Sequence, residues 1–112
     1  MRGSCHCGAV RIEVPAAPAW VGSCNCSICR RTGLLWSYYP PGDFRIESAE
    51  EATSPYIWGD RCIALHHCNT CGCITHWQNL MPDPEKMGVN ALLLDGFDRD
   101  STEIRKIDGA SF

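Results

Sequence analysis

The chain has 112 residues, of which 45% are hydrophobic and 21% charged, so its composition is that of a globular protein rather than a disordered or fibrous one. The formal net charge is −3 and only Lys86 and Lys106 are lysines, which argues against nucleic acid or an anionic membrane surface as a partner. Apolar runs reach only a few residues, and none of signal-peptide length opens the chain. We therefore expect a cytoplasmic protein without a membrane span, folded as a single domain over residues 1–112.

Short segments bounded by turn residues predict a mainly β protein. The clearest is 9–14, where Val10, Ile12 and Val14 face one side of a strand. Further strands are predicted, in chain order, at 35–39, 44–47, 56–58, 62–66, 74–77 and 102–107, and the third and fourth of these form a hairpin around Gly59-Asp60.

The other segments are predicted as turns and loops, with one ambiguous stretch. A short helical turn over 28–31 ends at Gly33, because glycine adopts the left-handed conformation that ends a helix. The polar stretch 48–55 and the segment 81–86 are predicted as loops. The apolar segment 87–94 has the length and the bounding glycines of a buried strand, although a short helix also fits it.

Nine cysteines are the outstanding feature of the composition. Their number is odd, and every one except Cys62 lies in a C-x-C or C-x-x-C group. A reducing cytoplasm keeps thiols free to bind zinc, whereas disulfide frameworks are typical of secreted chains. The cysteines therefore favour metal binding over disulfide bonds.

Two of the groups suffice for one closed metal site. In an extended C-x-C segment the two thiolates project to one face, and a C-x-x-C turn directs two thiolates at one ion. Gly72 follows such a turn directly and supplies the positive φ that it needs. The economical assignment is one all-thiolate zinc site formed by Cys5, Cys7, Cys68 and Cys71, which ties the N-terminus to a segment about 60 residues later.

Three ligands then remain within six residues: Cys24, Cys26 and Cys29. A structural zinc takes four protein ligands, whereas a catalytic zinc keeps three and leaves one position for water or substrate. The triple therefore indicates an open, catalytic site.

Spacing alone leaves two alternatives open. Cys26 and Cys29 could instead join the later C-x-x-C pair as a site of the zinc-ribbon type, though the gap is longer than usual. A fourth ligand, either Cys62, Cys73 or a histidine, would close the triple and make it structural. We interpret His66, His67 and His76 as strand or loop residues rather than ligands. Trp20 and Trp36 flank the triple, and one of them is a candidate for the wall of a pocket.

These motifs resemble the family of glutathione-dependent formaldehyde-activating enzymes, whose relatives include centromere protein V. The matching segments are Gly3-Ser4-Cys5-His6-Cys7-Gly8-Ala9-Val10-Arg11, Cys24-Asn25-Cys26-Ser27-Ile28-Cys29-Arg30-Arg31-Thr32-Gly33, His67-Cys68-Asn69-Thr70-Cys71-Gly72 and Met87-Gly88-Val89-Asn90 with Leu93-Leu94-Asp95. Their order and spacing extend over nearly the whole chain.

The resemblance implies a zinc-stapled β-tent, in which several small antiparallel sheets are joined by short helical turns. It implies two Zn²⁺ ions, a structural one on the four cysteines and a catalytic-type one on the triple Cys24, Cys26 and Cys29. The implied reaction is a carbon–sulfur lyase step in which glutathione and an aldehyde such as formaldehyde form an S-hydroxymethyl adduct. Arg30 and Arg31 follow the triple directly and are candidates for pairing with the carboxylates of glutathione.

A second interpretation belongs to a different functional class. Centromere protein V relatives suggest a non-catalytic, zinc-stabilised module that binds a protein partner. The acidic balance of the chain argues against nucleic acid or tubulin as that partner.

Overall fold

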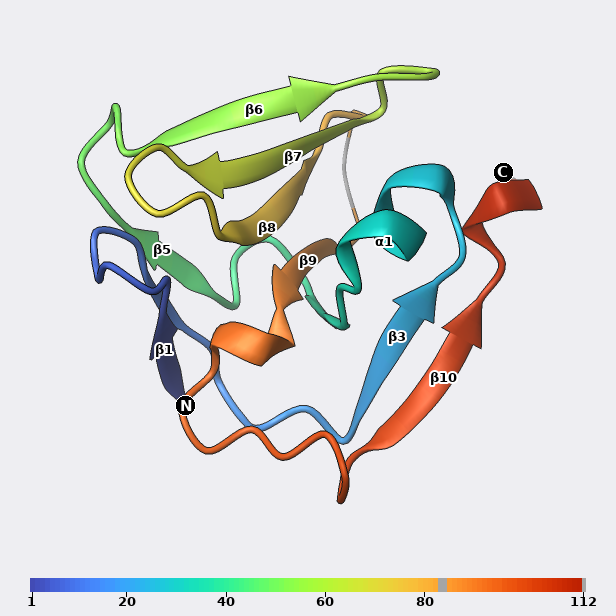
Figure 1. The fold of residues 1–112 in the computed structure, drawn as a ribbon, viewed down its shortest axis with the longest axis horizontal. Coiled ribbons are helices and arrows are strands. Elements are labelled where there is room, and N and C mark those ends of the chain that lie inside the picture. The colour runs from blue at the N-terminus through green and yellow to red at the C-terminus, as the bar shows by residue number, and fades with distance from the viewer. Residues whose placement is uncertain (83–84, 112) are drawn as a thin grey trace.

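The computed structural model describes residues 1–82 and 85–111 and is mainly β, as predicted (Figure 1). One sheet has three strands in the spatial order β1 (Arg2–Ser4), β2 (Arg11–Glu13) and β5 (Arg45–Glu47). The other has seven, in the order β10 (Glu103–Ile107), β3 (Trp20–Cys24), β4 (Trp36–Tyr39), β9 (Met87–Asn90), β8 (Ile74–Asn79), β7 (Ile63–Cys68) and β6 (Thr53–Ile57). Adjacent strands are antiparallel except β10 and β3, which run parallel. No helix in the described part of the chain is long and apolar enough to cross a membrane.

Most predicted elements are present, and two predictions need correction. The strands predicted from 9–14, 35–39, 44–47, 74–77 and 102–107 correspond to β2, β4, β5, β8 and β10, and the predicted hairpin is formed by β6 and β7. The loop predicted at 48–55 is wrong for its last three residues, because β6 already begins at Thr53. Pro55 is tolerated there because β6 is an edge strand, which has a neighbouring strand on one side only.

The segment 87–94 is half strand and half helix. It begins as β9 and continues as the 3₁₀ helix η1 (Ala91–Leu93). Asn90 ends the strand because its side-chain oxygen accepts a hydrogen bond from the N–H of Leu92, which caps the helix. Of the loop predicted at 81–86, residues 83 and 84 lie outside the described residues. The short strands β1 and β3 were not predicted.

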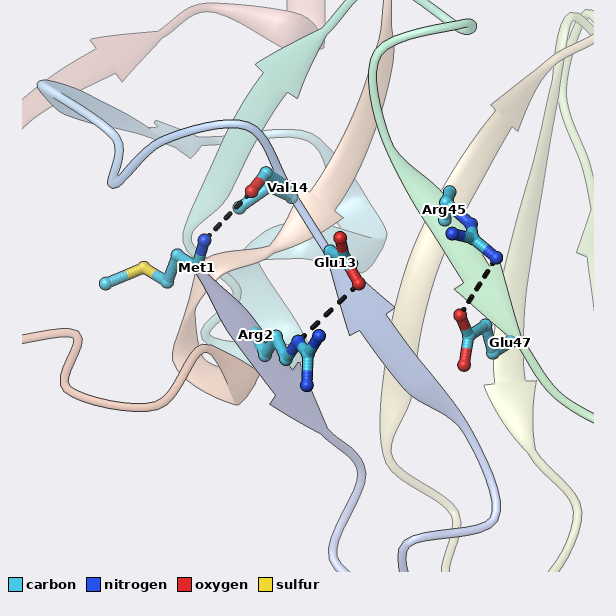
Figure 2. A network of polar contacts seen from close by, with 6 residues as sticks. All are labelled: Met1, Arg2, Glu13, Val14, Arg45 and Glu47. Carbon is cyan, nitrogen blue, oxygen red and sulfur yellow. Dashed lines mark hydrogen bonds and ion pairs between the residues drawn. The ribbon is translucent and has the colours of Figure 1, made fainter.

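Exposed ion pairs lie on the solvent-facing side of the three-stranded sheet (Figure 2). Arg2 lies opposite Glu13 across β1 and β2, with a nitrogen–oxygen distance of 3.6 Å, and Arg45 contacts Glu47 at 3.2 Å within β5. The terminal amine of Met1 donates a hydrogen bond to the Val14 carbonyl at 3.0 Å. Because these charges are exposed, each pair contributes about 1 kcal/mol or less. The sheet therefore depends on its buried face.

Apolar side chains of both sheets share one core. Ile12 from β2 packs with Val21 from β3 and Val89 from β9, all three buried. Gly3 in β1 makes a bridge to Leu94 just after η1, where any Cβ would overlap the backbone of Leu93. The lack of a side chain at Gly3 therefore allows the two sheets to meet.

The six-residue helix α1 (Ser27–Thr32) follows β3 directly. It ends, as predicted, at Gly33, which has φ 69° and donates its N–H to the Cys29 carbonyl at 3.0 Å. In Figure 1, α1 lies on the same side of the molecule as the C-terminus and the turn between β6 and β7. This side of the molecule carries the pocket described below.

Candidate functional site

Four cysteines from two segments far apart in the sequence meet at the end of β7. The sulfurs of Cys5, Cys7, Cys68 and Cys71 all lie within 4.8 Å of one another. The Cys5–Cys7 and Cys7–Cys68 sulfur distances are both 3.6 Å. Tetrahedral zinc with bonds of about 2.3 Å sets its sulfur ligands about 3.8 Å apart, so this cluster has the donor atoms and nearly the spacing of such a site.

Two backbone turns build the four-cysteine cluster. In the first, the N–H of Val10 donates to the Cys5 sulfur at 3.3 Å; in the second, the N–H of Thr70 donates to the Cys68 sulfur at 3.4 Å. Gly72 has φ 81°, as the turn prediction requires, and donates its N–H to the Cys68 carbonyl. Hydrogen bonds from the backbone, that of Cys73 foremost, lower the pKa of the Cys71 thiol to about 5. At Cys71 these donors favour the thiolate, which is the form that binds metal.

Three cysteines form a second cluster where β3 passes into α1. The sulfurs of Cys24, Cys26 and Cys29 lie within 4.8 Å of one another, and within the described residues no fourth cysteine, histidine or carboxylate joins the group. Burial raises the pKa of the Cys29 thiol to about 12. The pKa of the Cys26 thiol is lowered overall. Burial acts to raise this pKa, but hydrogen bonds from the backbone N–H groups of Cys29 and Ile28 and from neighbouring thiols outweigh the effect of burial. Three sulfurs suit zinc with one coordination position left over.

The sulfur of Cys29 is also held by a tryptophan. Trp36 in β4 is buried and donates its indole N–H to that sulfur at 3.3 Å. A hydrogen bond of this kind fixes the orientation of a metal ligand and tunes its basicity. Trp36 therefore supports the cluster in addition to packing in the core.

The C-terminal segment covers the sulfur of Cys24. Asn25 donates its backbone N–H to the Ile107 carbonyl at 3.0 Å, and its side-chain amide bonds both Asp108 and the N–H of Ala110. These bonds hold Gly109, the first residue of the 3₁₀ helix η2 (Gly109–Ser111), against the cluster. A Cβ at Gly109 would overlap the Cys24 sulfur. The approach of this backbone therefore requires glycine.

A cavity of about 460 Å³ opens over the three-cysteine cluster and over no other cysteines of the described residues. One wall is the β6–β7 hairpin, with Trp58, Ile63 and Leu65. Trp36 and Tyr38 from β4 and Trp77 from β8 form the inner wall, and Ile107 and Gly109 close the C-terminal side. The two charged residues in this lining are Asp60 and Lys86.

Two polar groups of the lining, the Tyr38 hydroxyl and the Lys86 ammonium, lie among aromatic side chains. Burial raises the pKa of the Tyr38 hydroxyl to about 12, so this group stays protonated at neutral pH. Lys86 holds its ammonium 4.8 Å from the centre of the Tyr38 ring, within range of a cation–π interaction. The Tyr38 ring also meets Trp77 edge to face, with centres 6.3 Å apart.

The predicted carboxylate-binding arginines lie beside the pocket. Arg30 and Arg31 are exposed on α1 and are absent from the lining. The guanidinium of Arg31 donates to the Ser27 carbonyl at 2.7 Å, which satisfies part of its hydrogen-bonding capacity within the helix. Their binding of a substrate carboxylate stays a prediction.

The alternative fourth ligands lie elsewhere. Cys73 packs beside the four-cysteine cluster, and the Cys62 sulfur contacts the Asp60 carbonyl at 3.8 Å. His66 and His76 stack on each other across β7 and β8 with ring centres 4.5 Å apart, and burial lowers the pKa of His76 to about 4. His67 also lies in β7, so these histidines are strand residues, as interpreted from the sequence.

Comparison with known proteins agrees with this geometry. The family model described as glutathione-dependent formaldehyde-activating enzyme matches residues 1–107. The chain belongs to this family. Its fold is also that of a crystal structure of a Rhodobacter sphaeroides protein, with a TM-score of 0.81 and 37% sequence identity over 96% of this chain and 100% of the other. The match to the family model ends at Ile107 of this chain, so the segment that carries Gly109 lies beyond that match.

Sequence reasoning missed several pocket residues because they come from distant strands. Of the two tryptophans proposed as a wall, Trp36 lines the pocket and Trp20 does not. Trp58, Trp77 and Tyr38 read equally well as core residues until strand pairing brings them together. Gly109 carries no signal of its own in the sequence.

Proposed function

We propose that this protein is a zinc-dependent carbon–sulfur lyase that joins the thiol of a small molecule to an aldehyde in the reducing cytoplasm. Glutathione and formaldehyde are the substrates that the family description suggests. The observation that supports the proposal is the contrast between the two clusters: one has four cysteines, and the other has three that line an open cavity. A site of the second kind has room for a substrate atom beside its ligands.

The three cysteines are suited to hold a metal ion that binds a substrate sulfur within the cavity. Bound by Cys24, Cys26 and Cys29, zinc would lower the pKa of a substrate thiol and hold its sulfur as a thiolate. Trp36 keeps the Cys29 sulfur in place through its indole N–H, and the backbone of Gly109 limits the space beside Cys24. The aromatic side chains of the lining, Trp36, Tyr38, Trp58 and Trp77, make most of the surface around the substrate sulfur apolar.

The reaction forms one bond between the sulfur and the carbonyl carbon. The proton of the thiol ends on the carbonyl oxygen, which becomes a hydroxyl, so no oxidant, reductant or further reactant is needed. Negative charge develops on that oxygen as the bond forms. Tyr38 carries the only hydroxyl among the described residues that line the cavity, and because its pKa is about 12 it can donate a hydrogen bond to this oxygen.

The test compares catalysis by the intact and the disrupted three-cysteine cluster. Exchange between formaldehyde, glutathione and their S-hydroxymethyl adduct is followed by NMR with zinc-loaded protein, with the Cys29→Ser variant and with buffer. We expect faster exchange with the intact protein and the buffer rate with Cys29→Ser, whose folding is checked by circular dichroism.

A second readout separates the enzyme from an interaction module. Cobalt is loaded in place of zinc, and its visible spectrum is recorded while thiols are added. An exchangeable ligand position changes the bands of the three-cysteine cluster. Exchange at the buffer rate together with an unchanged spectrum would contradict the proposal and favour a non-catalytic, zinc-stabilised protein-interaction module.

A further inference from the structure

The walls of the cavity are much less polar than a peptide thiol requires. Trp36 and Trp77 are buried, whereas Trp58 keeps 41% of its surface and Ile63 keeps 44% of its surface exposed at the mouth. A ligand that covers such exposed apolar side chains binds with a more favourable free energy, because apolar surface of both partners is removed from water. The cavity therefore favours an apolar occupant.

Few of the charged groups that glutathione needs face the cavity. Glutathione has two carboxylates, one ammonium group and two amides, each of which loses water on entry and requires a partner. The lining offers one cation, Lys86, and one anion, Asp60, while Arg30 and Arg31 lie outside it. The carboxylate of Asp60 already accepts a hydrogen bond from the Cys62 N–H at 3.2 Å. One acidic group on the ligand is matched by Lys86, and a second is not matched by the lining.

The position of the cysteines decides which substrate meets these walls. The three cysteines line the same cavity as Trp36, Tyr38, Trp58 and Trp77, so the carbon atoms attached to a sulfur held beside the cysteines meet these aromatic side chains. Formaldehyde has only two heavy atoms, so it fits a cavity of about 460 Å³ whatever the nature of its walls. The cavity walls therefore discriminate between thiols by the group attached to the sulfur, and not between aldehydes as small as formaldehyde.

We infer that the preferred thiol of this protein carries an apolar body, aromatic or branched, with at most one acidic group, which Lys86 binds. The inference rests on the proposed function, because it assumes that a substrate sulfur enters beside the three cysteines. Trp58 and Ile63 at the mouth are the residues that determine the specificity.

The experiment measures the affinity of three thiols for the cobalt-loaded protein from the change in its visible spectrum. The probes are phenylmethanethiol, 2-mercaptoethanol and glutathione, whose thiol groups have comparable acidity but whose bodies differ in polarity. We expect phenylmethanethiol to half-saturate the protein at a concentration roughly tenfold below those of the other two, because its ring is covered by the cavity walls. Cys29→Ser protein, which lacks a ligand of the cluster, is the blank.

Matched variants locate the effect. Trp58→Ala should raise the half-saturating concentration of phenylmethanethiol several-fold, and that of 2-mercaptoethanol much less. Ile63→Ser provides the same test from β7 should Trp58→Ala fail to fold. The control is Tyr56→Ala, which removes an aromatic side chain with 51% of its surface exposed from the same hairpin but outside the lining. The control should bind both thiols as the unmodified protein does.

Each outcome has a distinct meaning. Glutathione binding as tightly as phenylmethanethiol, or Trp58→Ala weakening both small thiols equally, would overturn the inference and leave the proposed function standing. A spectrum that responds to none of the thiols would overturn the proposed function itself, and the inference with it. Selective binding of phenylmethanethiol that depends on Trp58 but not on Tyr56 would support both.

Discussion

Strand β7 runs from the cavity over one cysteine cluster to the other cluster. Both clusters consist of cysteine sulfurs, but their surroundings differ. At its start, Ile63 and Leu65 face the cavity over the three-cysteine cluster; at its end, Cys68 belongs to the four-cysteine cluster. The four-cysteine cluster includes two of the most deeply buried residues, Cys5 and Cys68, and joins segments 61 residues apart. The three-cysteine cluster has one ligand fewer and faces open space. Under the proposed function, the number of thiols and the open space beside them distinguish a structural site from a reactive one.

The largest expected effect is the loss of the staple. Cys68→Ser should unfold the protein or destabilise it by on the order of 5 kcal/mol or more, because a zinc ion bound there would contribute its binding free energy directly to folding. Circular dichroism and denaturant unfolding measure this. Cys62→Ser is the matched control, since Cys62 belongs to neither cluster, and it should unfold almost as the unmodified protein does.

The three-cysteine cluster should tolerate the same change far better. Cys29→Ser should remove one metal ion per chain and abolish thiol binding, while stability falls by only about 1–2 kcal/mol from the loss of a buried sulfur and its hydrogen bond from Trp36. Metal analysis and thermal unfolding of the same sample give both values. If Cys29→Ser and Cys68→Ser were equally destabilising, the division into a structural and an open site would be wrong.

A smaller effect is expected from the segment beyond the family match. Gly109→Ala places a methyl group where the Cys24 sulfur lies and should weaken metal binding at the three-cysteine cluster by roughly tenfold, with the four-cysteine cluster unaffected. Competition with a chelating dye measures the two affinities. Gly42→Ala is the control because a Cβ there meets open space. Equal affinities for all three proteins would show that the C-terminal segment does not shape the site.

The smallest change is aimed at the chemistry alone. Tyr38→Phe removes the hydroxyl from the cavity and should slow thiol–aldehyde exchange several-fold, leaving thiol binding to the cobalt form unchanged. Because the pKa of Tyr38 is about 12, deprotonation of its hydroxyl should cause no loss of rate between about pH 7 and 10. NMR exchange rates across this range provide the measurement. A Tyr38→Phe protein as fast as the unmodified one would exclude this hydroxyl from the reaction.

The sequence predicted the local geometry of the cysteines better than their surroundings. Gly33 and Gly72 mark the ends of the two cysteine turns, and both have the positive φ expected of them. The grouping of Cys5 and Cys7 with a distant C-x-x-C pair followed from counting ligands. Local patterns of this kind depend on a few neighbouring residues, so they can be recognised without knowledge of the fold.

The cavity could not be predicted in this way. Trp58, Trp77 and Lys86 belong to different segments and come together only through the register of the seven-stranded sheet. The close approach of Gly109 to Cys24 depends on β10 pairing in parallel with β3, an arrangement that the alternation in 102–107 does not specify. Nonlocal pairing therefore decides which predicted core residues also line the site.

Metal content per chain before and after dialysis against a mild chelator tests the central contrast most directly. We predict two zinc ions per chain before dialysis and one afterwards, with the circular dichroism spectrum unchanged, because the open three-cysteine cluster releases its ion while the four-cysteine cluster retains its own. Addition of zinc should then restore the second ion. Retention of both ions, or loss of both together with the fold, would contradict the assignment of one closed and one open site.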